Sequence, residues 1–150
     1  MPAGEQFRRY YPGLIPMEER LWRTWLKEHE TDFEAFEYNV RVGEGIRIAP
    51  RALDADPVLQ EKISRQFQEA TQKKIDVVGR RGGEVWIFEV EERPGTRALG
   101  QLISYQTLLP RTRLVEGPIV LALVARRIGG DNLIVFEDAG VVVWRVNLED

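Results

Sequence analysis

Two adjacent glycines, Gly82–Gly83, separate two strand-forming runs, and this pattern constrains the fold more than any other feature of the chain. The first run is Lys73–Arg80 and the second is Glu84–Glu92. A glycine pair between two such runs is typical of a two-residue hairpin loop, because the residues of that loop often need positive φ angles. The sequence therefore predicts an antiparallel β-hairpin in which Arg81 lies opposite Glu84.

Extending this register along the hairpin predicts a cluster of charged side chains. Asp76 lies opposite Glu89 and Lys74 opposite Glu91, and the alternation of a strand puts Lys74 and Asp76 on one face. Opposed side chains have Cβ atoms about 5 Å apart, so the two carboxylates repel each other unless a cation lies between them. A divalent ion with oxygen ligands meets that need. The alternative is an exposed sheet face on which Lys74 and Glu91 form an ordinary ion pair.

Apolar spacing and capping residues predict helices and further strands around this hairpin. The helices run from Pro16 to about Glu30, from the cap at Asp56 to about Gln72, over Thr96–Leu109, and from Asp131 to Glu137. The further strands are Glu37–Val42, Ile46–Ala49, Gly117–Arg127 and Val141–Val146. This order favours an α/β fold, in which residues 16–150 form a single domain with one mixed β-sheet flanked by helices. Residues 1–15 are expected to form an irregular N-terminal arm.

Glu18 is a carboxylate in an unexpected place on the first predicted helix. At about 100° per residue it falls near the centre of an apolar stripe, which consists of Leu21, Trp22, Trp25 and Leu26. A carboxylate on a buried face needs a partner, since burying an unpaired charge is costly. The alternative is that Glu18 only marks the start of the helix, where the helix dipole favours a negative charge.

The composition restricts which metals and which catalytic groups the chain can use. It has no cysteine, which excludes disulfides, thiolate catalysis and cysteine zinc sites. Its one histidine, His29, falls near the end of a predicted helix and is expected to be solvated. A metal site here therefore consists of oxygen ligands, which favours Mg²⁺, Mn²⁺ or Ca²⁺.

Charge and hydropathy limit the partners and the compartment. The net charge is −3, which argues against strong nonspecific affinity for nucleic acid but allows a local basic surface. No apolar run approaches the roughly 18 residues that span a bilayer, so no membrane partner is expected. Residues 1–9 lack the apolar region of a signal peptide. These features predict an intracellular, cytoplasmic protein of cellular or viral origin.

Three segments occur in an order that resembles the core of PD-(D/E)XK nucleases. They are Ile75–Gly79, then Trp86–Glu91 after the glycines, then Ala98–Tyr105. In that family a strand aspartate, a hairpin, a (D/E)XK strand and a helix with a GQL..Y-like pattern follow one another. Val40–Gly45 resembles the preceding strand and turn, and the resemblance spans roughly residues 16–146. It implies a restriction-endonuclease-like fold and a nuclease-like activity.

The resemblance also implies roles for individual residues. Asp76 and Glu89 would hold Mg²⁺ or Mn²⁺, and the main-chain carbonyl of Val90 would be a third ligand. Glu18 could match the glutamate that is frequent in the first helix of the family.

The sequence departs from the family at one position, because Glu91 stands where the motif has lysine. A glutamate there cannot donate to a phosphate or stabilise negative charge that develops in the reaction. Lys74 could replace the missing lysine from the neighbouring strand. Arg97 or Gln101, one turn apart on the next helix, could instead contact the substrate, together with Tyr105 from the same helix.

Three functions agree with these patterns. The first is a Mg²⁺-dependent endonuclease or exonuclease that hydrolyses phosphodiester bonds of DNA or RNA. The second is an inactive module with the same fold, which binds nucleic acid or forms a homo-oligomer or a larger assembly in viral or repair machinery. The third is an unrelated binding domain whose charges form surface salt bridges. Metal binding separates the first function from the third, and metal-dependent cleavage separates it from the second.

Overall fold

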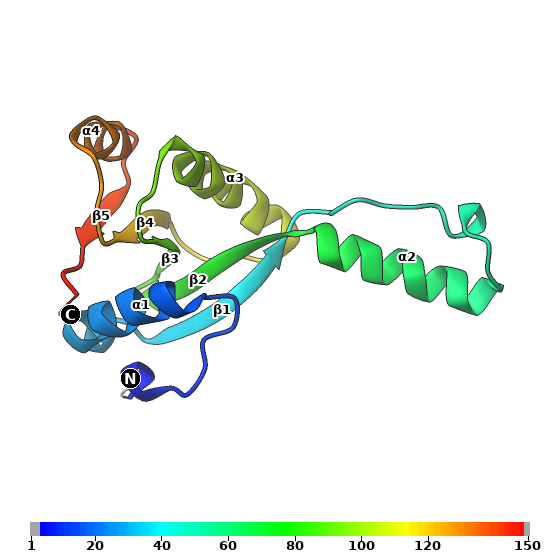
Figure 1. Ribbon diagram of the computed structural model, residues 1–150, viewed down its shortest axis with the longest axis horizontal. Coiled ribbons are helices and arrows are strands. Elements are labelled where there is room, and N and C mark those ends of the chain that lie inside the picture. The colour runs from blue at the N-terminus through cyan, green and yellow to red at the C-terminus, as the bar shows by residue number, and fades with distance from the viewer. Residues whose placement is uncertain (1–3, 149–150) are drawn as a thin grey trace.

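A five-stranded mixed sheet forms the centre of the protein in a computed structural model that describes residues 4–148 (Figure 1). The strands are β1 (Ala35–Val42), β2 (Lys73–Arg81), β3 (Glu84–Glu91), β4 (Ile119–Ala125) and β5 (Val142–Arg145), and they lie side by side in this order. β1, β2 and β3 pair antiparallel, whereas β3, β4 and β5 pair parallel. The predicted mixed α/β sheet is therefore confirmed.

Helices cover both faces of this sheet. α1 (Pro16–His29) packs on one face, and α3 (Thr96–Thr112) and α4 (Gly130–Asp138) pack on the other (Figure 1). α2 (Pro57–Thr71) lies apart from the sheet, and short 3₁₀ turns occur at Glu5–Phe7, Glu30–Asp32 and Pro50–Ala52. Proline opens both α1 and α2, where its missing N–H costs no helical hydrogen bond. Within the described residues, no helix is long and apolar enough to span a membrane.

The two faces of the sheet bury two separate cores. The α1 face holds an aromatic core in which Trp22, Trp25 and Phe88 make close ring contacts. The opposite face packs aliphatic side chains of the sheet, such as Ile87, against α3 residues such as Leu102. Because β3 and β4 are covered on both faces, their sequences are nearly continuous apolar runs.

The predicted N-terminal arm, residues 1–15, packs on the domain along its described part. Tyr11 is fully buried in the α1 core, and its hydroxyl donates to the main-chain carbonyl of Glu5 at 2.6 Å. The Arg23 guanidinium of α1 donates to the carbonyls of Gln6 and Arg8. Residues 4–15 are therefore part of the packed structure, while residues 1–3 of the predicted arm lie outside the described range.

The β2–β3 hairpin has the predicted register over its first five pairs, from Arg81–Glu84 to Val77–Phe88. Gly82 and Gly83 both have positive φ angles, 52° and 84°, as the two-residue loop requires. The ladder between β2 and β3 ends at Val77–Phe88, so the next predicted pair, Asp76–Glu89, is not part of it.

The side-chain alternation of β2 breaks at this same point. Ile75 is in the α3 core, but Val77, two residues on, is in the α1 core. β1 changes faces at the matching place: Val40 packs against the α3 core and Tyr38 against the α1 core. Asn39 between them has a φ of 55°, the only positive φ of a non-glycine residue in the described chain. The two strands therefore stay paired while both switch faces.

The predicted strand at Ile46–Ala49 is wrong, because this segment runs along α2 and joins no sheet. Its backbone groups bond to α2 side chains instead. The Ile46 N–H donates to the Thr71 hydroxyl at 2.6 Å, and the Ser64 hydroxyl donates to the Ile48 carbonyl at 2.6 Å. Side chains of a helix therefore satisfy polar groups that a partner strand would otherwise satisfy.

Residues 43–72 form a hairpin extension, since Val42 and Lys73 at its two ends are a β1–β2 ladder pair. It contains α2, which projects away from the sheet (Figure 1). The α2 helix and its Asp56 cap were predicted, and the Asp56 carboxylate accepts from the Leu59 N–H at 3.0 Å. Its apolar residues recur at helical spacing, but Val58, Leu59, Ile63 and Phe67 are all exposed. The predicted helix is therefore confirmed, but no described helix or strand covers its apolar side.

We expect the sheet to fold without the hairpin extension. Replacing residues 43–72 with an Asn-Gly turn should leave the melting temperature within a few degrees of the wild type, because Val42 and Lys73 are already paired. Circular dichroism melts would measure this. Phe88→Ala in the α1 core is the contrasting variant and should cost about 3–5 kcal/mol. Loss of folding in the shortened chain would show that the extension supports the domain.

Candidate functional site

Asp76 lies where β2 and β3 separate, one residue beyond the last ladder pair. Its Oδ2 accepts a hydrogen bond from the Val90 N–H of β3 at 2.9 Å. The carboxylate therefore takes the place of a main-chain carbonyl and bridges the widening gap between the strands. This position holds Asp76 in a fixed orientation between the two sheet faces.

Glu89 is the second carboxylate of the site, and it is only 4% exposed. Its neighbours in alternation, Ile87 and Val85, are in the α3 core, so Glu89 is on the face that α3 covers. The Tyr105 hydroxyl of α3 lies against it and donates to the main-chain carbonyl of Lys74 at 3.0 Å. Tyr105 thereby connects β2, β3 and α3 at one point.

Burial and mutual repulsion raise the pKa of both carboxyl groups. Burial raises the pKa of Asp76 to about 7, and the negative charges of Glu18 and Glu91 add to the rise, while the Val90 N–H opposes it. Burial likewise raises the pKa of Glu89 to about 9, with repulsion from Asp76 next in importance. The pair therefore resists carrying two negative charges unless positive charge is supplied.

Glu18 and Glu91 complete a cluster of four interacting carboxylates. Burial raises the pKa of each, and the charge of Glu91 adds to the rise for Glu18. Glu18 Oε1 also accepts from the Ile15 N–H at 3.2 Å, so it caps the start of α1. Glu18 therefore caps the start of α1 and also interacts electrostatically with the other carboxylates. Glu91 was predicted to lie opposite Lys74, in the position of the motif lysine, and its repulsion with the other carboxylates was missed.

Arg97, Gln101 and Tyr105 are spaced four residues apart and form one row along α3. Arg97, at the start of the row, is exposed, and its charge lowers the pKa of Glu91. The Gln101 Oε1 atom is buried and accepts no hydrogen bond within the described structure. A buried acceptor without a donor costs about 1–3 kcal/mol. It points to a missing donor or cation beside this row.

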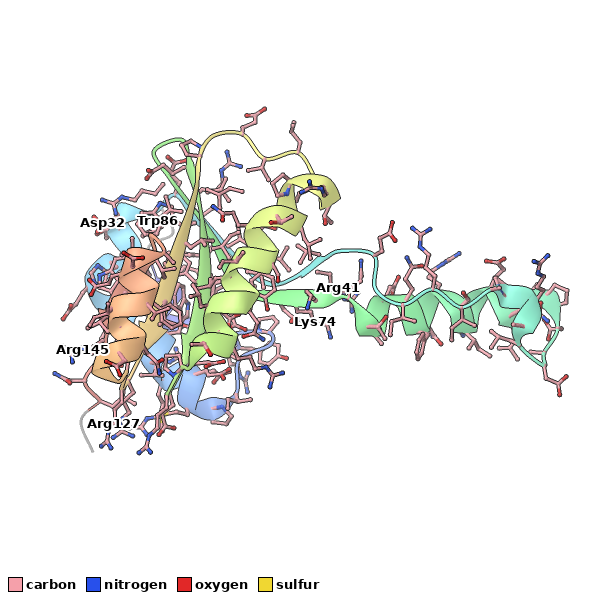
Figure 2. All side chains as sticks on the ribbon, turned by 90° about the horizontal axis from the view of Figure 1, so that it is seen from above. Asp32, Arg41, Lys74, Trp86, Arg127 and Arg145 are labelled. Carbon is pink, nitrogen blue, oxygen red and sulfur yellow. The ribbon has the colours of Figure 1, made fainter. Side chains whose placement is uncertain are left out.

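The structure does not bring the Lys74 side chain to the predicted position. Lys74 pairs with Arg41 of β1, and both lie exposed near the base of the hairpin extension (Figure 2). The β2–β3 ladder ends at Val77–Phe88, so Lys74 has no ladder partner on β3, and Glu91 pairs only on its other side, with Ala125 of β4. The register could not be extended because β2 leaves β3 and switches faces at Asp76. What Lys74 contributes to the site is its main-chain carbonyl, which the Tyr105 hydroxyl binds.

The donor set of the cluster suits a hard divalent cation, although the cluster is not a complete cage. Over residues 4–148, no three carboxylate or imidazole groups are arranged to hold one metal ion. Asp76 and Glu89 supply two carboxylates, and the unpartnered oxygen of Gln101 belongs to the helix turn before Tyr105, which contacts Glu89. Mg²⁺ is commonly bound by one or two carboxylates with water in its other positions. The residues present therefore fit Mg²⁺ or Mn²⁺ better than a metal that needs nitrogen or sulfur ligands.

Comparison with protein-family models, with curated proteins and with solved structures found no match to this chain.

The raised pKa values predict how stability depends on pH. The folded protein keeps protons on Asp76 and Glu89 that the unfolded chain releases near pH 4, so the free energy of unfolding falls as pH rises from about 4 to about 9. Glu89→Gln cannot ionise and should be about 1–3 kcal/mol more stable than the wild type at pH 9, without metal, and equal to it at pH 4.

Urea denaturation in EDTA at both pH values would measure this difference. Glu61→Gln on exposed α2 is the matched control, and it should change the free energy of unfolding by the same small amount at pH 4 and at pH 9. Equal stability of Glu89→Gln and the wild type at pH 9 would contradict the burial of a repelled carboxylate.

Proposed function

We propose that this protein is a metal-dependent nuclease-like domain of the PD-(D/E)XK type, with a restriction-endonuclease-like fold, that hydrolyses phosphodiester bonds of DNA or RNA. The observation that carries the proposal is the buried, mutually repelling pair Asp76 and Glu89 where β2 and β3 separate. The row on α3 beside it supports the same proposal, because Gln101 and Tyr105 also belong to the pattern that resembles the family.

The residues of the chain have distinct roles in this proposal. Asp76 and Glu89 would hold the cation, with the carbonyl of Val90 and the oxygen of Gln101 as further donors. When bound, Mg²⁺ or Mn²⁺ polarises the phosphate and lowers the pKa of a bound water. Tyr105 orients Glu89, and the Val90 N–H orients Asp76. The destabilising repulsion is thus kept in the fold because a cation relieves it.

Arg97 is the residue that we propose in place of the missing motif lysine. Its charge acts on Glu91, which occupies the lysine position, and its side chain is exposed to an incoming ligand. A guanidinium can bind a phosphate through two parallel N–H groups. Arg97 is favoured over Lys74, because the β2–β3 ladder ends before Lys74 and its side chain lies exposed near the base of the hairpin extension (Figure 2).

A second candidate function is the inactive module that binds nucleic acid or takes part in an assembly. The exposed apolar stripe of α2 favours it, because Val58, Leu59, Ile63 and Phe67 form a surface suited to a partner. Glu91 in the lysine position favours it as well. The two functions differ in whether the carboxylates still support cleavage.

We expect the wild type to cut single-stranded DNA, double-stranded DNA or RNA with Mg²⁺ or Mn²⁺ and not with EDTA. Asp76→Asn and Glu89→Gln should lower the rate at least about 100-fold, because each removes a carboxylate that would hold the cation at the reacting phosphate. Glu61→Gln on α2 is the matched control. Gel assays would follow cleavage, and thermal melts with millimolar Mn²⁺ would follow metal binding, which should stabilise the wild type but not an Asp76→Ala/Glu89→Ala double variant.

A wild type that cuts none of these nucleic acids would contradict the proposed activity. Cleavage by Glu91→Lys alone would then favour the inactive module with a decayed site. Absence of both cleavage and metal stabilisation would leave a fold without this chemistry.

Arg97 and Lys74 can be separated by single substitutions. Arg97→Ala should lower kcat at least about 100-fold while the Mn²⁺-induced rise in Tm persists, because Arg97 acts on the phosphate and not on the metal. Lys74→Ala should change kcat much less, since its side chain lies at the base of the hairpin extension. The opposite order of effects would return the lysine role to Lys74.

A further inference from the structure

A pocket of about 590 Å³ opens at the carboxyl ends of β4 and β5, away from the hairpin extension. Its lining is basic and polar and comprises Arg126, Arg127, Ile128, Arg145 and Asn147. Arg127 and Arg145 lie at this end of the molecule in Figure 2. Three guanidinium groups around one hollow repel one another, and the protein as a whole is acidic with a net charge of −3. Such a gathering of positive charge attracts an anionic ligand.

The main chain fixes these arginines in place. The N–H groups of Arg126 and Arg127 both donate to the Glu92 carbonyl, at 3.2 and 2.9 Å. The Arg126 guanidinium also lies 3.9 Å from the Glu92 carboxylate. Arg127 and Arg145 are exposed and form no ion pair with any described residue. These two side chains are therefore available to bind an anion, and the main chain that carries them is held in place.

The pocket is next to the carboxylate cluster along the sheet. Glu91 pairs with Ala125, and Ala125 pairs with Arg145, while Arg126 follows Ala125 directly in sequence. Neighbouring strands are about 5 Å apart, so the arginine positions begin about 5–10 Å from Glu91. A nucleic-acid strand rises about 3.4 Å per nucleotide, so this separation corresponds to about two or three nucleotides.

The positive surface also continues beyond this pocket. Asn147 lines a second hollow of about 470 Å³, which α1 lines with Arg20, Arg23 and Lys27, and also with Glu28. Both hollows thus meet at Asn147. A ligand with several phosphates along a chain fits such an arrangement better than a single phosphate ion does.

We propose that Arg127 and Arg145 form a subsite for a backbone phosphate of a nucleic-acid strand whose reacting phosphate lies at Asp76 and Glu89. The proposal rests on the proposed function and deepens it, because it gives the strand a direction across the sheet. The strand passes from the end of β3 over the ends of β4 and β5 toward α1. Its specificity is for phosphates and not for bases, since arginines on phosphates position a strand without reading its sequence.

Binding of a fluorescein-labelled single-stranded DNA 20-mer in EDTA tests the subsite without cleavage. Arg127→Gln/Arg145→Gln should weaken binding at least about tenfold at low salt. It should also reduce the slope of log Kd against log salt by about 0.7, since that is the change for one lost phosphate contact on a single strand. Arg51→Gln/Arg65→Gln, two exposed arginines of the hairpin extension, is the matched control and should stay within about twofold of the wild type.

An equal loss in the control variant, or no loss in the pocket variant, would overturn the subsite. Inorganic phosphate in the same assay, at matched ionic strength against chloride, separates a strand site from a site for a free phosphate. Release of the DNA by millimolar phosphate beyond the effect of chloride would overturn the strand proposal.

The subsite and the nuclease activity fail in different ways. If DNA binding depends on Arg127 and Arg145 but the wild type never cuts, the subsite stands and the nuclease activity fails. If the wild type cuts and the pocket variant has an unchanged KM, the nuclease activity stands and the subsite fails.

Discussion

The hydrogen bond from the Val90 N–H to Asp76 is the contact on which the arrangement of the site depends. It replaces a main-chain ladder bond where β2 and β3 separate, and so it lets the strands diverge without leaving this N–H unpaired. The positive φ of Asn39 on β1 accompanies the change of face opposite Asp76. Backbone strain of this kind costs about 1–3 kcal/mol and persists where the surroundings hold it in place. In this protein the strained residue, Asn39, lies beside Asp76 of the carboxylate cluster, which is the candidate functional site.

Burial of the two hydrophobic cores stabilises the fold and offsets the free energy that the repelling carboxylates cost. Trp22 and Trp25 each lie 5.1 Å from the Phe88 ring in edge-on contacts, and such pairs add about 0.5–1.5 kcal/mol each beyond their buried area. Phe88 precedes Glu89 on β3, so one strand carries the centre of the aromatic core and a charged site on its other face. Buried, mutually repelling carboxylates with raised pKa values cluster at functional sites, and this is the physical basis of the proposed cation site.

The sequence predicted the hairpin correctly as far as local rules apply. The register from Arg81–Glu84 to Val77–Phe88 follows from a loop whose geometry is set by two glycines. The predicted register failed for Lys74, because the side-chain alternation of β2 breaks at Asp76. That break depends on contacts with β1 and β3, which the local sequence pattern does not reveal. Likewise, α2 forms where its cap and its apolar spacing predict a helix, but its apolar side is exposed. The periodicity indicates a helix and says nothing about whether a partner covers it.

The sequence by itself determined the helices and most of the strands, singled out Asp76, Glu89 and Glu18 as candidate site residues, and imposed oxygen chemistry through the absence of cysteine. Only the tertiary structure decided that Glu91 interacts with these carboxylates, that Lys74 lies elsewhere, and that Arg127 and Arg145 share a pocket. The physical reason is distance along the chain. Glycine turns, caps and periodicity act between residues a few positions apart, whereas burial and electrostatic repulsion depend on which distant segments the sheet brings together.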